Sequence, residues 1–191
     1  MYTFHKTPRF ASKPVIFTDD LRDNIVYTAL EAAYVRAQRH RVVYDHAPRG
    51  LNEMSFHVGL GRRMGHTTAI TQLFFDNADT SVLVCTTGSM KSYVIGMLSQ
   101  MLRDKFPKER VFLEDPEAVD FMVRDAMRRV RHRIMTVHEF TQHNWWRGIH
   151  DVKNVMIDSF SYLKDTDQQS VVDTLDTLKA HRCLNYAFLV Q

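Results

Sequence analysis

The sequence predicts a three-layer α/β domain with a mostly parallel, five-stranded sheet. Two observations support this class: short apolar runs recur along the chain, and segments of helical length and periodicity separate them. The apolar runs cover residues 54–59, 81–86, 133–140, 154–160 and 186–191. Because parallel strands need crossover connections of helix length, the alternation favours strands that are covered by helices on both faces.

The helices are expected from apolar spacing and end signals. A first helix is expected near residues 19–40, with Thr18 or Asp19 at its start and a basic last turn. Further helices are expected over 66–77, 90–106, 116–131 and 167–182. Ser89 is the expected cap of the second of these, and Pro116 suits the first turn of the third. We expect one globular domain, with residues 1–49 as an N-terminal helical lead-in and residues 50–191 as the core.

The composition is that of an ordinary soluble globular protein. Of the 191 residues, 45% are hydrophobic and 25% charged, and the net charge of +3 is too small to indicate nucleic-acid binding by itself. No apolar run reaches the length of a membrane span, and the polar N-terminal stretch predicts no secretory signal. Cys85 and Cys183 lie in apolar stretches, which suggests buried free thiols and an intracellular location. The histidines show no metal-ligand spacing, so no metal cluster is expected.

Residues 56–75, "FHVGLGRRMGHTTAITQLFF", have the pattern of a phosphate-binding loop between a strand and a helix. In such a loop, glycines allow a tight turn, backbone N–H groups at the helix start meet anionic oxygens, and a hydroxyl holds Mg²⁺. The alternative is that the glycines only serve the turn. The candidate nucleotide-binding residues are Gly61, Arg62, Arg63, Met64, Gly65, His66, Thr67 and Thr68.

Three segments in order resemble a known family. "GLGRRMGHTT" is similar to the nucleotide loop of P-loop NTPases of the RecA-like, helicase and viral terminase type. "VLVCTTGSMKSYVIGML" resembles the segment that helicase-type motors place after that loop. "VKNVMIDSFSYL" resembles their second nucleotide motif, with Asp158 at its end. The resemblance covers about residues 50–191 and implies a P-loop fold, ATP and Mg²⁺ as ligands, Thr67 and Asp158 as the metal partners, and a role in viral DNA replication or packaging.

The chain departs from the family pattern in positions that matter for hydrolysis. His66 stands in place of the phosphate-binding lysine, and imidazole is shorter and mostly neutral near pH 7. Leu60 stands where the full loop pattern has a glycine, and Ser159 stands where many relatives carry the glutamate that polarises water. Glu139 is the remaining candidate for that role, against an ordinary surface residue, so the predicted catalytic residues are Glu139 and Asp158.

A basic segment suggests a second ligand. In "RDAMRRVRHR", Arg124, Arg128 and Arg131 share one helical face, opposite an apolar stripe. Such a face can follow nucleic-acid phosphates, and the alternative is a solvated helix flank. Two functions stay open: a nucleotide-binding ATPase-like protein with weak or partner-dependent hydrolysis, or a non-catalytic descendant of the fold that binds protein or nucleic acid. The expected partners are therefore a nucleotide, with DNA, another protein or a second copy of the chain as further candidates.

Overall fold

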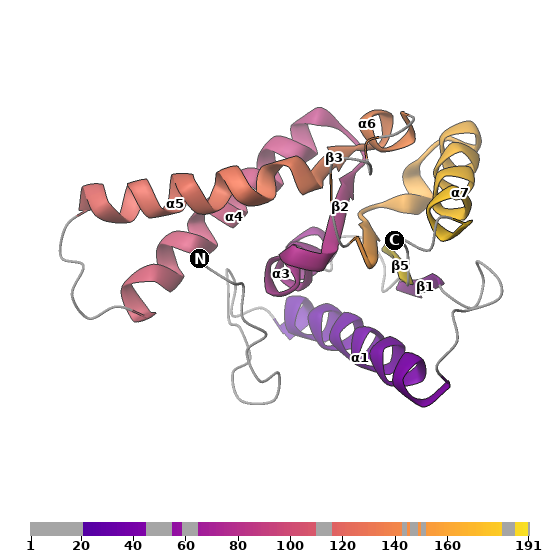
Figure 1. Cartoon of the computed structure of the whole chain (residues 1–191), viewed down its shortest axis with the longest axis horizontal. Coiled ribbons are helices and arrows are strands. Elements are labelled where there is room, and N and C mark those ends of the chain that lie inside the picture. The colour runs from indigo at the N-terminus through magenta and orange to yellow at the C-terminus, as the bar shows by residue number, and fades with distance from the viewer. Residues whose placement is uncertain are drawn as a thin grey trace.

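The protein is an α/β domain built on a parallel sheet, as the sequence predicts (Figure 1). The structure is a computed structural model, and it describes residues 21–44, 55–58, 65–109, 116–142, 145, 149, 152–180 and 186–190. From β1 to β5, one or two of the described α-helices separate each strand from the next along the chain.

All the strand pairings in the described sheet are parallel. The strands are β1 (Ser55–Val58), β2 (Ser81–Cys85), β3 (Ile134–Thr136), β4 (Asn154–Ile157) and β5 (Tyr186–Val190). They lie in the order β1-β5-β4-β2-β3, and Val155 of β4 is in register with Val82 of β2 on one side and Ala187 of β5 on the other. Every residue of β2, β4 and β5 is buried. These strands are therefore covered on both faces, which explains their continuous apolar runs.

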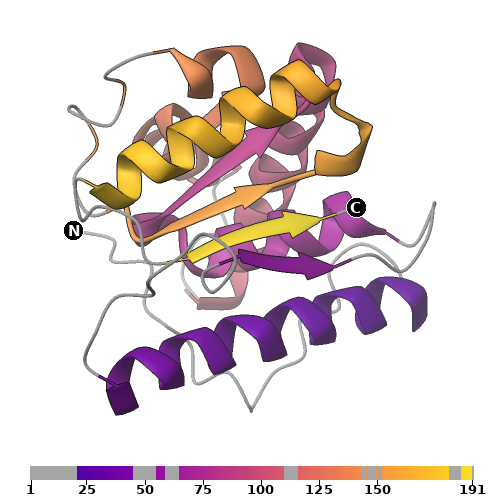
Figure 2. The same cartoon turned by 90° about the vertical axis from the view of Figure 1, so that its right-hand side faces the viewer.

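The helices cover both faces of the sheet. They are α1 (Leu21–Tyr44), α3 (His66–Asp76), α4 (Gly88–Glu109), α5 (Pro116–Val130), α6 (Val137–Thr141) and α7 (Asp165–Ala180). Short 3₁₀ turns cover Ala78–Thr80, Arg131–Arg133 and Phe160–Tyr162. Figure 2 shows α1 and α7 on opposite faces of the sheet. The chain crosses the sheet from β1 through β2 to β3 and returns to β4 and β5, so right-handed crossovers place the two sets of helices on opposite faces.

The N-terminal helix α1 is an integral layer of the domain. It packs along α3, and its buried residues include Val26, Leu30 and Tyr34. The Tyr34 ring stacks on Phe188 of β5, with 5.8 Å between the ring centroids. Through its contacts with α3 and β1, α1 supports the position of α3 on its face of the sheet.

Two details of the prediction are wrong at helix starts. The run 133–140 is not one strand: β3 ends at Thr136, whose side chain caps α6 by accepting a hydrogen bond from the Glu139 backbone N–H, while the Glu139 side chain accepts from the Thr136 N–H. This reciprocal pair is a capping box, which outweighs the β propensity of the run. For α4 the capping side chain is Thr87 instead of Ser89, because Thr87 Oγ1 accepts from the Met90 N–H at 3.1 Å.

Two further predictions concern burial and the membrane. Cys85 is a buried free thiol, as predicted, and Cys183 lies outside the described residues. Among the described helices, none has the length and apolarity needed to cross a membrane.

Candidate nucleotide-phosphate site

The candidate site lies at the carboxyl edge of the sheet. Because the strands are parallel, the ends of β1, β2 and β4 all meet at this edge. The chain leaves β2 toward α4 on one face and leaves the neighbouring β4 toward α7 on the other. In open α/β sheets, such a reversal of direction opens a crevice in which ligands bind.

The α3 helix begins at this edge without a side-chain cap at Gly65. Gly65 precedes it in the left-handed conformation, with φ 74° and ψ 25°, a region that glycine adopts without strain. No side chain caps the start of α3, and its first turn carries no acidic residue. The first N–H groups of α3 therefore present a partial positive charge that an anionic oxygen can meet.

Thr67 and Asp158 are in direct contact, although 91 positions separate them in the chain. The Thr67 hydroxyl donates to Asp158 Oδ2 at 2.8 Å. Thr67 lies in the first turn of α3, and Asp158 follows the last residue of β4, where its N–H donates to the Val84 carbonyl at 3.0 Å. The fold thus brings together the two residues that the sequence resemblance pairs, Thr67 and Asp158.

The Asp158 carboxylate is fully buried and held from both sides. Ser159 Oγ donates to Asp158 Oδ1 at 3.2 Å, so each carboxylate oxygen has a hydroxyl donor. Burial raises the pKa of Asp158, while the Thr67 and Ser159 hydroxyls and the nearby His66 act to lower it. Ser159 has φ 58°, the single non-glycine residue with a positive φ among the described residues. Residues with strained backbone dihedral angles of this kind occur at functional sites more often than elsewhere.

His66 lies beside this carboxylate and is neutral near pH 7. Burial lowers the pKa of His66 below its usual value, although the charge of Asp158 acts in the opposite sense. At the first position of α3 the imidazole can donate a single hydrogen bond, but it does not supply the permanent charge of a lysine.

Glu139, the predicted water-orienting residue, is held by other groups at the end of β3. Both of its carboxylate oxygens accept from Lys91 Nζ, at 2.7 and 2.8 Å, and one also accepts from the Thr136 N–H. Partial burial acts to raise its pKa, but the bonds from Lys91 and Thr136 outweigh that effect and lower the pKa of Glu139. Lys91, on the second turn of α4, was not predicted to take part, and nothing in the sequence pairs it with a residue 48 positions away.

Cys85 lies close to Asp158, Lys91 and Glu139 at the carboxyl edge of the sheet. Burial raises the pKa of the Cys85 thiol to about 12, and the charges of Asp158, Lys91 and Glu139 all act on it. Cys85 is the last residue of β2, between the strands that lead to Asp158 and Glu139. The thiol is therefore un-ionised.

The remaining predicted site residues fall into two groups. Thr68 lies half-buried on α3, and Gly61, Arg62, Arg63 and Met64 lie outside the described residues. Arg124, Arg128 and Arg131 are exposed on α5 and the turn that follows it, away from the elements that carry Thr67 and Asp158. Within the described part of the chain, no cluster of three or more histidine, cysteine or carboxylate side chains forms a metal site.

Comparison of the chain with family models, curated proteins and solved structures finds no significant match.

Proposed function

We propose that this protein binds a nucleoside triphosphate with Mg²⁺ at the start of α3 and hydrolyses it slowly. The observation that supports this most directly is the Thr67–Asp158 hydrogen bond. A loop that binds a metal and phosphates brings such a hydroxyl and carboxylate together, and here the pair is hydrogen-bonded with the carboxylate fully buried. The resemblance to P-loop NTPases describes the same two residues.

In this proposal the α3 N–H groups bind phosphate oxygens, and Thr67 and Asp158 hold the cation. Mg²⁺ keeps most of its water and takes one or two protein oxygens together with phosphate oxygens, so a hydroxyl and one carboxylate suffice. When bound, the cation neutralises phosphate charge. The buried Asp158 carboxylate offsets part of its own desolvation cost by meeting the cation.

Slow turnover follows from the groups around the site. The neutral His66 brings no full charge to the phosphates, and the Glu139 carboxylate is occupied by Lys91 and the helix cap. Loss of one charged stabiliser of a transition state commonly lowers rates by about 10² to 10³. We therefore propose binding without efficient hydrolysis unless a partner rearranges these contacts.

The test is thermal unfolding with Mg²⁺ and ATP. A ligand at about 100 times its Kd stabilises the folded state by about 2.7 kcal/mol, which raises the Tm of a chain of this size by about 5 to 11 °C. Mg²⁺ alone and ATP with excess chelator serve as controls. Unchanged melting temperatures at millimolar Mg²⁺ and ATP would count against the proposal.

His66→Lys sharpens the same test. The ammonium adds a charge-assisted hydrogen bond to the phosphates, so we expect the affinity for nucleotide to rise about tenfold or more. His66→Gln is the matched control, since it keeps a donor without adding charge. Equal affinities for the lysine and glutamine variants would mean that no phosphate lies at the start of α3.

A second candidate function is a fold that binds a protein or nucleic acid without nucleotide. The neutral His66 and the serine after Asp158 favour it, because neither supports hydrolysis. The melting experiment separates the two candidates, since only the first predicts stabilisation by nucleotide.

A further inference from the structure

A basic groove of about 810 Å³ runs between α4 and α5. On the α4 side, its lining residues recur every four positions from Lys91 to Arg103, a row about 18 Å long at the rise of an α-helix. Ile95, Val123 and Met127 give the groove an apolar component. The groove is separate from the phosphate loop and is lined along its length by one helix on each side.

The charge of this groove is strongly positive and poorly compensated. Its lining includes five lysine and arginine residues and one carboxylate, Asp120. Arg103 pairs with that carboxylate at 3.1 Å, and Lys91 pairs with Glu139. Arg124, Arg128 and Arg131 pair with no carboxylate in the part of the chain that the structure describes, as shown by the ion pairs found there.

The stability of α5 explains the unpaired arginines only in part, because the helix dipole favours Arg128 in the last turn. Their mutual repulsion is unfavourable, and Arg129 on the same helix shows that an intrahelical partner is possible, because it pairs with Asp125. Arg124 and Arg128 are about 6 Å apart along the helix axis, and Arg131 lies about 4.5 Å further on. A row of cations at such intervals matches a chain of phosphates better than a single small anion.

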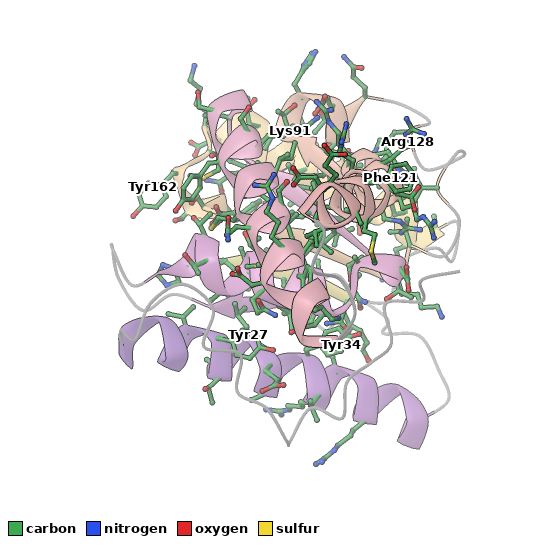
Figure 3. The ribbon with its side chains drawn as sticks, turned by 90° about the vertical axis from the view of Figure 1, so that its left-hand side faces the viewer. Tyr27, Tyr34, Lys91, Phe121, Arg128 and Tyr162 are labelled. Atoms are coloured by element: carbon green, nitrogen blue, oxygen red, sulfur yellow. The ribbon has the colours of Figure 1, made fainter. Side chains whose placement is uncertain are left out.

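The shape of the site favours a single strand over a duplex. Proteins read a duplex with an element that protrudes into its groove, whereas single strands lie in positively charged grooves with exposed rings for the bases. Here the cations line a concave surface. Phe121 is 69% exposed and precedes Arg128 by two helical turns, so both project from the same flank of α5 (Figure 3).

We propose that the α4–α5 groove binds single-stranded nucleic acid, with phosphates on Arg124, Arg128 and Arg131 and a base stacked on Phe121. This site does not depend on nucleotide at the start of α3. It is therefore tested with nucleotide absent, and its failure leaves the proposed function intact.

The first test is a salt titration of fluorescent oligothymidine by anisotropy. Replacement of Arg124, Arg128 and Arg131 by alanine should reduce the slope of log K against log salt by about 2, at about 0.7 per phosphate contact on a single strand. The matched control removes three arginines outside the groove, as Arg36→Ala, Arg39→Ala and Arg129→Ala. All six side chains are exposed, so circular dichroism and Tm should show both variants folded.

The second test concerns the base. Phe121→Ala should weaken binding about fivefold or more, the loss of one stacked base, while Tyr162→Ala should leave it unchanged. Tyr162 is 55% exposed and lies on the far side of the molecule from α5 in Figure 3.

Four results would overturn the proposal, and three of them come from the nucleic-acid measurements. They are no binding of oligothymidine by the wild type at low salt, an equal loss of slope in the control variant, and competition by duplex DNA as strong as by the single strand. Competition by polyglutamate at equal charge would overturn it as well and assign the groove to an acidic protein surface.

Discussion

Replacement of Thr67 by valine tests the contact at the centre of the candidate site. Valine keeps the shape and nearly the helix propensity of threonine but lacks the hydroxyl. The Asp158 carboxylate is fully buried, and the Thr67 hydroxyl is the donor at 2.8 Å to its Oδ2 atom. The variant therefore leaves a buried charged oxygen without that donor.

The size of the effect follows from the charge on Asp158. A hydrogen bond to a charged group contributes about 1.5 to 3 kcal/mol, so Thr67→Val should lower the free energy of unfolding by that amount where Asp158 is ionised. For a chain of this size, each kcal/mol shifts the Tm by about 2 to 4 °C, which gives a loss of about 3 to 12 °C. Thr67→Ser should retain most of the stability. Thr177→Val is the control for the substitution itself, because its hydroxyl donates only to the Asp173 carbonyl of its own helix.

The loss should also depend on pH in a defined direction. Burial raises the pKa of Asp158 and the Thr67 hydroxyl acts to lower it, so the valine variant has an Asp158 pKa still higher than that of the wild type. The stability difference is thus fully present above both pKa values and shrinks as the pH falls through them, when the carboxyl becomes neutral in both proteins.

A double-mutant cycle with Asp158→Asn isolates the pair. In the asparagine background the acceptor is neutral, so Thr67→Val should cost only about 0.5 to 1.5 kcal/mol. The reasoning would be refuted by a valine variant that is as stable as the serine variant at every pH, with no coupling to position 158.

Two further variants separate stability from function. Asp158→Asn should raise the Tm of the nucleotide-free protein, because burial of the ionised carboxylate opposes folding above its raised pKa. The same variant should lose its stabilisation by Mg²⁺ and ATP. A nucleotide-free Tm below the wild-type value would contradict this. Glu139→Gln should leave the slow ATPase rate within a few-fold of the wild-type rate, because Lys91 and Thr136 already hold the carboxylate. A rate lower by about 10²-fold or more would instead make Glu139 the group that activates water.

The sequence predicts the sheet of this protein well because the strands are buried on both faces. Such strands need apolar residues at nearly every position, and β2, β4 and β5 have them, apart from Ser81 and Asn154 at the starts of β2 and β4. The run 133–140 has similar apolar content, yet the chain turns into α6 at Thr136. The pattern of threonine followed three residues later by glutamate is the signal that could have located this helix start.

The candidate site is predicted only in part, because contacts between distant segments depend on the whole fold. Thr67 and Asp158 were paired by resemblance, and their 2.8 Å separation depends on the relative placement of α3 and β4. The ion pair of Lys91 with Glu139 joins α4 to α6 across neighbouring strands, and no spacing rule reports it. The groove has the same origin, since α5 packs on α4 outside the sheet and brings two rows of side chains together.

Lys91 connects the two regions for which we propose ligands. Its side chain lines the α4–α5 groove, and its ammonium binds both oxygens of Glu139 at the carboxyl edge of the sheet. Lys91 is 22% exposed, and its ion pair is shielded from solvent more than the one between Arg103 and Asp120. In the proposed complex, a phosphate chain in the groove would compete with Glu139 for this ammonium, because both are anions within reach of one cation. The same lysine holds Glu139 when the groove is empty, and a polyanion bound in the proposed groove would weaken that ion pair.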